Sequence, residues 1–166
     1  MSRKNALLWA SRVVCALALT PANAQAAPAG RTLKVRLNYA GAEKVDQQHK
    51  IYILLFDANP YSSARLVDST SEAVPPAPEA GVCHILRRES VSGKKQHLTF
   101  SGLAGPSVYA MAFLDKAGKY NPHEDAPSGS PMGVYGKAAG NADAIVLKEG
   151  KSVGVTLAFD DSHKTP

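Results

Sequence analysis

The chain has 166 residues, of which 45% are hydrophobic, and its 19 Lys and Arg against 14 Asp and Glu give a formal net charge of +5. This length suffices for one domain with its own core. The two cysteines are too few for a cysteine-rich zinc motif.

The first 24 residues have the three parts of a secretory signal peptide. A basic start leads into a short apolar run at 13–19 and a small-residue site at 22–24. We expect cleavage after Ala24, with cleavage after Ala26 as the alternative. A membrane-spanning helix would need about 20 apolar residues, and Arg12 interrupts this segment too early. The sequence therefore predicts a periplasmic or secreted bacterial protein with no integral membrane segment in its mature part.

Removing this segment changes the charge and the cysteine content of the chain. Arg3, Lys4 and Arg12 leave with it, so that 16 basic residues face 14 acidic ones and the net charge falls to +2. The pI of about 9.2 is then weak support for a nucleic-acid partner, and none is predicted. Cys83 becomes the single cysteine, which excludes an internal disulfide. We expect a buried, inert thiol; an intermolecular disulfide or a reactive thiol is the alternative.

Residues 25–30 form a small-residue leader that is expected to be disordered, and residues 31–39 follow as the first strand. This strand alternates between apolar and polar side chains, the pattern of a strand with one buried and one solvent-exposed face. Residues 50–56 follow, and within them the run from Ile51 to Phe56 is apolar without a break. Such a run indicates a central strand buried on both faces, and the turn at 57–60 ends it. The exposed face of the first strand carries Thr32, Lys34, Arg36 and Asn38.

The rest of the chain reads as short strands separated by turns. Long loops are expected at 61–81, which contains Pro75, Pro76 and Pro78, and at 116–143. The first two predicted strands here, 82–88 and 96–100, are expected to pair in a hairpin, and a second central strand follows at 108–115. The last two, 144–147 and 152–159, are expected to form a closing hairpin, and residues 161–166 form a polar tail.

Seven predicted strands, and no predicted helix after the signal peptide, indicate an all-β domain over residues 31–160. Short strands at regular spacing with turn residues between them are typical of a β-sandwich. We therefore expect a single antiparallel β-sandwich of seven or eight strands, of the transthyretin or immunoglobulin kind.

Motifs for catalysis are missing from the sequence. It contains no nucleophile elbow, Walker loop, dinucleotide fingerprint or His-Glu-x-x-His motif. Its histidines stand at no short ligand spacing from one another, and His84 and His97 are interpreted as sheet-face residues. No catalytic residue, cofactor or enzymatic activity is predicted, and a hydrolase with an unrecognised site has no nucleophile–base pair to support it.

The densest polar segment is residues 115–125. Asp115 ends the second central strand, a common place for a calcium ligand, but Ala117 and Lys119 occupy the next two alternating ligand positions and offer no oxygen to an ion. The preferred interpretation is a solvated loop in which Asp115 caps a turn, and a metal-dependent periplasmic protein is the alternative. The candidate metal ligands are Asp115, His123, Glu124 and Asp125.

A second loop, residues 129–136, contains three glycines and Pro131, which together require a particular backbone path. It is expected to cover an open sheet edge, and a lid or the wall of a ligand groove is the alternative. The candidate binding residues in the two loops are Tyr120, Pro131 and Tyr135.

Three segments in this order, 50–56, 98–115 and 129–136, resemble the exported bacterial β-sandwich proteins catalogued as domain of unknown function 2141. The shared patterns are Phe-x-Gly-Leu at 100–103 and Gly-x-Pro-x-x-x-Tyr-Gly at 129–136. The family's Asp-Asn-Gly-rich loop is replaced here by Asp-Lys-Ala-Gly-Lys. The same segments also look like transthyretin-like domains, such as carboxypeptidase regulatory modules. Either resemblance implies a seven- or eight-stranded sandwich and brings no established activity.

The sequence thus predicts an exported, non-catalytic β-sandwich that acts as a binding or accessory module for an unknown protein or small ligand. Its binding face is expected to include the loop 116–143. Because a fold does not determine a function, this last step is an analogy.

Overall fold

The computed structural model describes residues 30–72, 77, 79–136 and 141–166. The predicted signal peptide, the leader up to residue 29 and the three prolines of the 61–81 segment lie outside the described residues. Within the described ranges, no helix is long and apolar enough to span a membrane.

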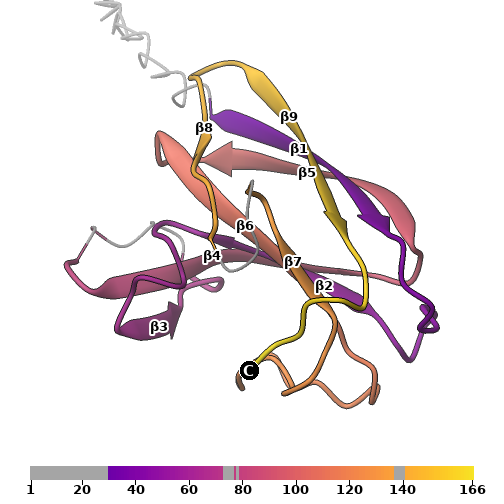
Figure 1. Cartoon of the computed structure of the whole chain (residues 1–166). Coiled ribbons are helices and arrows are strands. Elements are labelled where there is room, and N and C mark those ends of the chain that lie inside the picture. Colours follow the sequence, from indigo (N-terminus) through magenta and orange to yellow (C-terminus); the bar gives the residue numbers. More distant parts are fainter. Residues whose placement is uncertain (1–29, 73–76, 78, 137–140) are drawn as a thin grey trace, which may run out of the picture.

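The described residues form strands in two sheets that pack face to face, as Figure 1 shows. The small sheet has the order β5-β1-β9, and the large sheet has the order β3-β4-β2-β6-β7, with β8 also paired to β6. The bounds are β1 Arg31–Tyr39, β2 Ile51–Phe56, β3 Arg65–Asp68, β4 Val82–Val91, β5 Lys95–Leu103, β6 Ser107–Leu114, β7 Met132–Val134, β8 Ile145–Val146 and β9 Ser152–Phe159. The all-β sandwich fold expected from the sequence is confirmed, but the described residues form nine strands and not the seven or eight expected.

The main core lies between the two sheets. Alternate residues of β1, among them Leu33, Val35 and Leu37, point inward and are almost wholly buried against β2 and β6. Strand β2 is buried on both faces, as predicted, because Leu54 and Phe56 point away from this core into a second apolar cluster on the outer face of the large sheet. Burying apolar side chains in these two clusters supplies the main drive for folding.

The expectation of a purely antiparallel sandwich is wrong, because both sheets are mixed. Strand β9 runs parallel to β1, and β3 runs parallel to β4. Both predicted hairpins are also wrong. Strand β4 pairs with β2 while β5 pairs with β1, and β8 pairs with β6 while β9 pairs with β1. The turn after each first strand carries the chain across to the other sheet, so that two consecutive strands cover the core from opposite sides.

Two short strands fall inside segments that were expected to be loops. Strand β3 lies within 61–81 and has only four residues, and β7 lies within 116–143 and has three. Segments this short and this polar or glycine-rich carry too little periodicity to predict. The predicted tail is polar, but it is hydrogen-bonded: Met132 N donates to His163 O, and Thr165 N donates to Ser130 O. The tail therefore covers the outer edge of the large sheet beside β7.

Candidate functional site

The carboxylate of Asp115 organises the loop that follows β6. One of its oxygens accepts the backbone N–H groups of Ala117 and Gly118, at 3.2 and 2.9 Å, and the other accepts the N–H of Tyr120 at 2.8 Å. The side chain is buried, so these hydrogen bonds stabilise a carboxylate that would be costly to bury without partners. This geometry matches the turn cap preferred from the sequence.

The remaining candidate metal ligands do not gather around Asp115. His123, Glu124 and Asp125 are all exposed, and Glu124 accepts a hydrogen bond from the side-chain amide of Asn121. In the part of the chain that the structure describes, no three His, Cys, Asp or Glu side chains are placed to hold an ion. The geometry therefore offers no support for the metal-dependent alternative.

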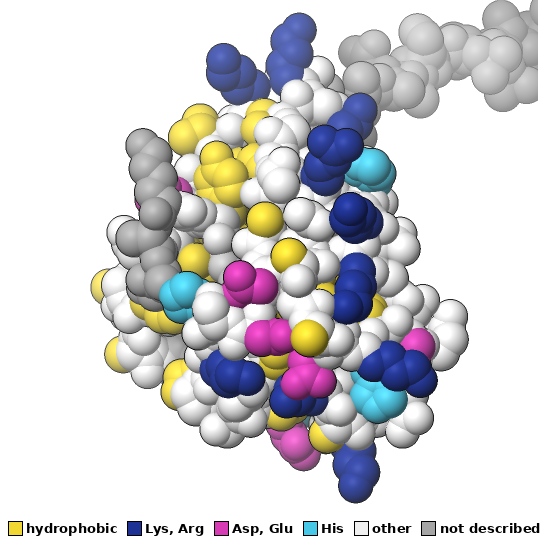
Figure 2. Space-filling view, turned by 45° about the vertical axis from the view of Figure 1, so that its right-hand side comes forward, with side chains coloured by type: hydrophobic (Ala, Val, Ile, Leu, Met, Phe, Trp, Pro, Cys, Tyr) yellow, Lys and Arg dark blue, Asp and Glu magenta, His cyan; other side chains and the backbone are white. Residues whose placement is uncertain are grey.

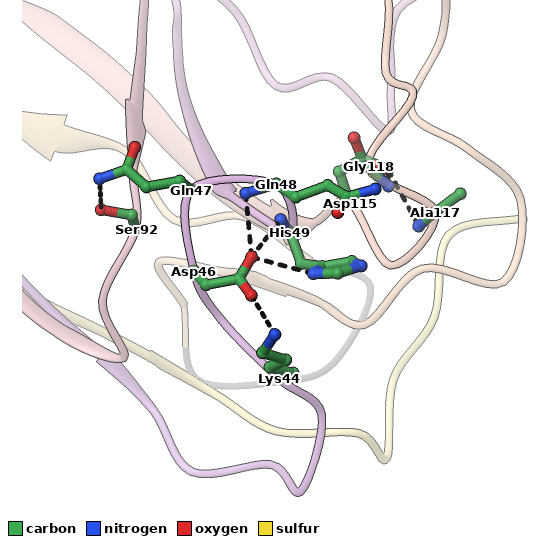
Figure 3. A network of polar contacts seen from close by, with 9 residues as sticks. All are labelled: Lys44, Asp46, Gln47, Gln48, His49, Ser92, Asp115, Ala117 and Gly118. Carbon is green, nitrogen blue, oxygen red and sulfur yellow. Dashed lines mark hydrogen bonds and ion pairs between the residues drawn. The ribbon is translucent and has the colours of Figure 1, made fainter.

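The loop 41–50 packs against the Asp115 loop, as Figure 3 shows. Asp46 accepts the backbone N–H groups of Gln48 and His49 and the imidazole Nδ1 of His49, at 2.8 to 2.9 Å, and pairs with Lys44. These contacts hold the pKa of Asp46 well below its usual range, with the Lys44 bond contributing most. A Cβ on Gly118 would collide with Gln48. The bonds of Asp46 and of Asp115 thus each hold their own loop in shape, which is a structural task, and the two loops meet where Gln48 packs on Gly118.

The three candidate binding residues do not share one surface. Tyr120 lies on the outer face of the large sheet, with its ring 4.6 Å from that of Tyr52 and 4.9 Å from that of Phe113. Tyr135 packs instead against the main core between the sheets. Pro131 is buried, and its carbonyl accepts a hydrogen bond from Leu114 N. These residues attach the segments 115–125 and 129–136 to different faces of the large sheet. This is how loops that cover a sheet are packed, and it does not form one binding surface.

A pair that the sequence did not indicate joins the half-buried Asp57 to the buried His84. Asp57 Oδ2 lies 2.6 Å from His84 Nδ1, and Asp57 Oδ1 accepts the backbone N–H of His84 at 2.7 Å. Cys83 is the neighbouring thiol, but its Sγ donates to the carbonyl of Ala58, and burial raises its pKa to about 11. Because the thiolate is the nucleophilic form, this site does not activate Cys83.

The outer face of the small sheet carries polar side chains on all three strands and basic ones on β1 and β5. Residues at alternate positions of β5, β1 and β9 point away from the core, and adjacent strands place them side by side: Arg36 lies opposite His97 on one side and Thr156 on the other. The outward set is Lys95, His97, Thr99 and Ser101 on β5, Thr32, Lys34, Arg36 and Asn38 on β1, and Ser152, Gly154, Thr156 and Ala158 on β9. We call these twelve positions the cationic face.

The cationic face has no acidic counterpart. None of its three strands contains Asp or Glu, and every ion pair found among the described residues involves other side chains. Lys34, Arg36, Lys95 and His97 are all exposed. Figure 2 shows Lys and Arg side chains in a run along the right-hand side of the molecule, with acidic side chains mainly below and beside it.

A hollow of about 370 Å³ lies in this surface at the end of the sheet where β5 begins. It is lined by Arg36, Asn38, Lys95, His97 and Thr156, together with Leu37 and Gln96. The acidic residues that follow β9 are hydrogen-bonded to residues outside the hollow. Asp161 accepts hydrogen bonds from Tyr39 and Ala42, and Asp160 accepts one from Ser162 N. The hollow is therefore lined by hydrogen-bond donors and positive charge.

The sequence contained part of the signal for this surface. Lys34 and Arg36 stand at alternate positions of a strand whose exposed face was predicted, and Lys95 and His97 alternate in the same way. The prediction missed the surface because it placed 96–100 beside 82–88 and so separated the two pairs.

The chain matches no protein-family model, no curated protein and no solved structure. The resemblance to proteins with domain of unknown function 2141, and the transthyretin-like alternative, therefore stay predictions from sequence patterns.

Proposed function

We propose that this protein is an exported, non-catalytic binding module that holds an anionic ligand on its cationic face. The observation that carries the proposal is the placement of Lys34, Arg36, Lys95 and His97 on one sheet face with no acidic side chain among them. Some basic groups elsewhere among the described residues, such as Lys116 and Arg88, do have acidic partners.

Electrostatics favours this use of the face. Residues two apart on a strand are about 7 Å apart, so Lys34 and Arg36 repel each other by only about 0.6 kcal/mol in water. The sheet therefore tolerates unpaired cations at little cost. A ligand with several negative groups is attracted by several of these cations at once. The positive charge of the face also increases the rate at which such a ligand associates.

The loop 116–143, in which the sequence placed the binding face, has a different part in this proposal. Its described residues fasten the loop to the large sheet through Asp115 and through the packing of Tyr120. It serves as a cover for the second apolar cluster, and the ligand surface lies on the opposite sheet.

Export rests on the signal peptide expected at 1–24. Producing the full chain in a Gram-negative host and measuring the intact mass of the periplasmic protein tests this step. A mature species that begins at Gln25 is expected, and a cytoplasmic protein of full mass would contradict export.

Anion binding is tested with the mature chain and dextran sulfate, a soluble polyanion, by calorimetry at low and physiological salt. The double variant K34E/R36E should lose most of the binding. The double variant K119E/K164E changes the net charge equally at exposed lysines outside the cationic face and should bind like the wild type. Equal losses in both variants, or no binding by the wild type, would contradict the proposal.

A further inference from the structure

We infer that the anionic ligand is an acidic polysaccharide, a sugar chain bearing carboxylate or sulfate groups, which lies along β1 across the cationic face. This inference rests on the anion-binding function proposed above and adds the class of ligand. It is drawn from the side chains that lie between the cations.

Hydroxyl and amide groups alternate with the positive charges on this face. Thr156 lies beside Arg36 on one strand, Thr99 lies beside Lys34 on the other, and Asn38 lies beside Lys95. Such a surface recognises a ligand that carries both negative groups and many hydroxyls. An acidic sugar chain has this composition at every repeat, whereas a phosphate ion or a carboxylate alone would use the cations and leave the hydroxyls unmatched.

The same face lacks side chains on which two other kinds of partner commonly rely. Its twelve outward positions include no Phe, Tyr or Trp, and proteins that bind single-stranded nucleic acid rely on such aromatic side chains to stack the bases. They also include no large apolar side chain, which a protein surface inserts when it docks into the interface of a bilayer. The composition therefore favours an acidic polysaccharide over single-stranded nucleic acid and over a membrane.

The dimensions of the face suit an extended chain. Three strands about 4.8 Å apart form a surface about 10 Å wide, and four outward positions on a strand span about 20 Å. The positive charges lie on the middle strand β1 and on the edge strand β5. On the other side, Gly154 of β9 leaves open space and Ala158 carries only a methyl group. A single sugar chain fits this width with its charged groups turned toward β5.

The experiment compares ligands on the mature chain at physiological salt. Alginate oligomers, which are carboxylated, and dextran sulfate are tested beside neutral dextran, duplex DNA, polyglutamate and vesicles of phosphatidylglycerol. We expect binding to the two acidic polysaccharides and weaker binding, by about tenfold or more, to every other probe. The K34E/R36E variant should lose alginate binding by at least about tenfold, and K119E/K164E should keep it.

A second pair of changes separates sugar recognition from charge alone. Thr99→Val and Thr156→Val keep the shape and the β-branched side chain but remove the hydroxyls. Together they should weaken alginate binding several-fold while leaving its salt dependence unchanged, whereas K34E/R36E should reduce the salt dependence, because fewer ions are released when fewer cations engage the ligand.

The outcomes distinguish the two proposals. If DNA, polyglutamate or the vesicles bind as tightly as alginate through Lys34 and Arg36, the polysaccharide inference is overturned and the anion-binding function stands. If the two Thr changes have no effect on alginate binding, the inference is likewise overturned. If no polyanion binds, or if the K34E/R36E variant binds polyanions as tightly as the wild type does, both proposals are wrong.

Discussion

Asp57 and His84 lie 27 positions apart in the chain and hold each other by three hydrogen bonds. Besides the two bonds to the Asp57 carboxylate, Asp57 N donates to His84 O at 3.2 Å. The contact closes the end of the β2–β4 pair, next to the register shift between Leu55 and Phe56. The His84 side chain is only 7% exposed.

The Asp57→Ala variant should therefore unfold more easily by about 2 to 3 kcal/mol, because it leaves two donors of His84 without a partner in a buried site. Urea unfolding followed by circular dichroism measures this loss. The exposed Asp125→Ala variant is the control and should stay within about 0.5 kcal/mol of the wild type. Similar stabilities for the two variants would show that the pair contributes nothing to the fold.

Asp115 gives a second prediction, which also tests the metal alternative. The Asp115→Ala variant leaves three backbone N–H groups unpaired and should lose about 2 kcal/mol of stability, while Asp115→Asn, which keeps one acceptor, should lose less. Because both carboxylate oxygens already accept N–H groups, a chelator should leave the melting temperature unchanged. A melting temperature that falls with chelator and recovers with Ca²⁺ would contradict this assignment.

Strand positions were predictable from periodicity, and strand partners were not. The burial of Leu33, Val35 and Leu37 on one face of β1 follows from alternation alone, and so does the exposure of Lys34 and Arg36 on the other. Pairing depends on contacts between distant segments, which no local pattern records. For this reason the first strand was predicted with its correct bounds, while both hairpins were misplaced.

The same reasoning explains what could be predicted of the candidate site. The cap formed by Asp115 is local, since its partners lie within five residues, and the sequence indicated it. The cationic face needs β5 beside β1, and the Asp57–His84 pair needs β2 beside β4. Both depend on sheet order, so their residues were visible in the sequence while their proximity was not.

The contact between Tyr39 and Asp161 makes the stability depend on acid pH. The Tyr39 hydroxyl donates to Asp161 Oδ1, and this bond is the main reason why the pKa of Asp161 lies below its usual value. A lowered folded-state pKa contributes stability that is present above about pH 4, the usual Asp value, and is lost as the pH falls toward the folded-state value.

The Tyr39→Phe variant should therefore lose less stability than the wild type between about pH 4 and pH 2, since it lacks the bond that favours the ionised form. Urea unfolding at a series of pH values measures this slope. Asp46 and Asp160 also have lowered pKa values, so some acid sensitivity should persist. The Tyr61→Phe variant is the control and should keep the wild-type slope, and equal slopes in all three proteins would rule out the Tyr39–Asp161 linkage.

The thiol of Cys83 should be unreactive in the folded protein. Its side chain is fully buried, and burial raises its pKa to about 11, so that little thiolate is present at neutral pH. A thiol reagent should leave the native protein unmodified and should label it promptly in denaturant. Rapid labelling of the native state, or a disulfide-linked dimer on a non-reducing gel, would favour the reactive or intermolecular alternative.

Gly133 and Gly154 provide a matched test of how closely the two sheets approach. Gly133 lies on β7, where a Cβ would overlap the side chain of Phe159 on β9, whereas a Cβ on Gly154 would meet nothing within 4 Å. Neither glycine has a positive φ, so alanine is compatible with the backbone at both positions. Crowding should decide the result.

The Gly133→Ala variant should lose about 1 to 3 kcal/mol, because β7 or Phe159 must shift to make room. The Gly154→Ala variant should be neutral, or more stable by up to about 1 kcal/mol, since alanine reduces the freedom of the unfolded chain. Thermal and urea unfolding of the two variants measure the difference. If Gly133→Ala were as stable as Gly154→Ala, β7 and β9 would not be in close contact. The two sheets would then pack less tightly at this edge than the structure shows.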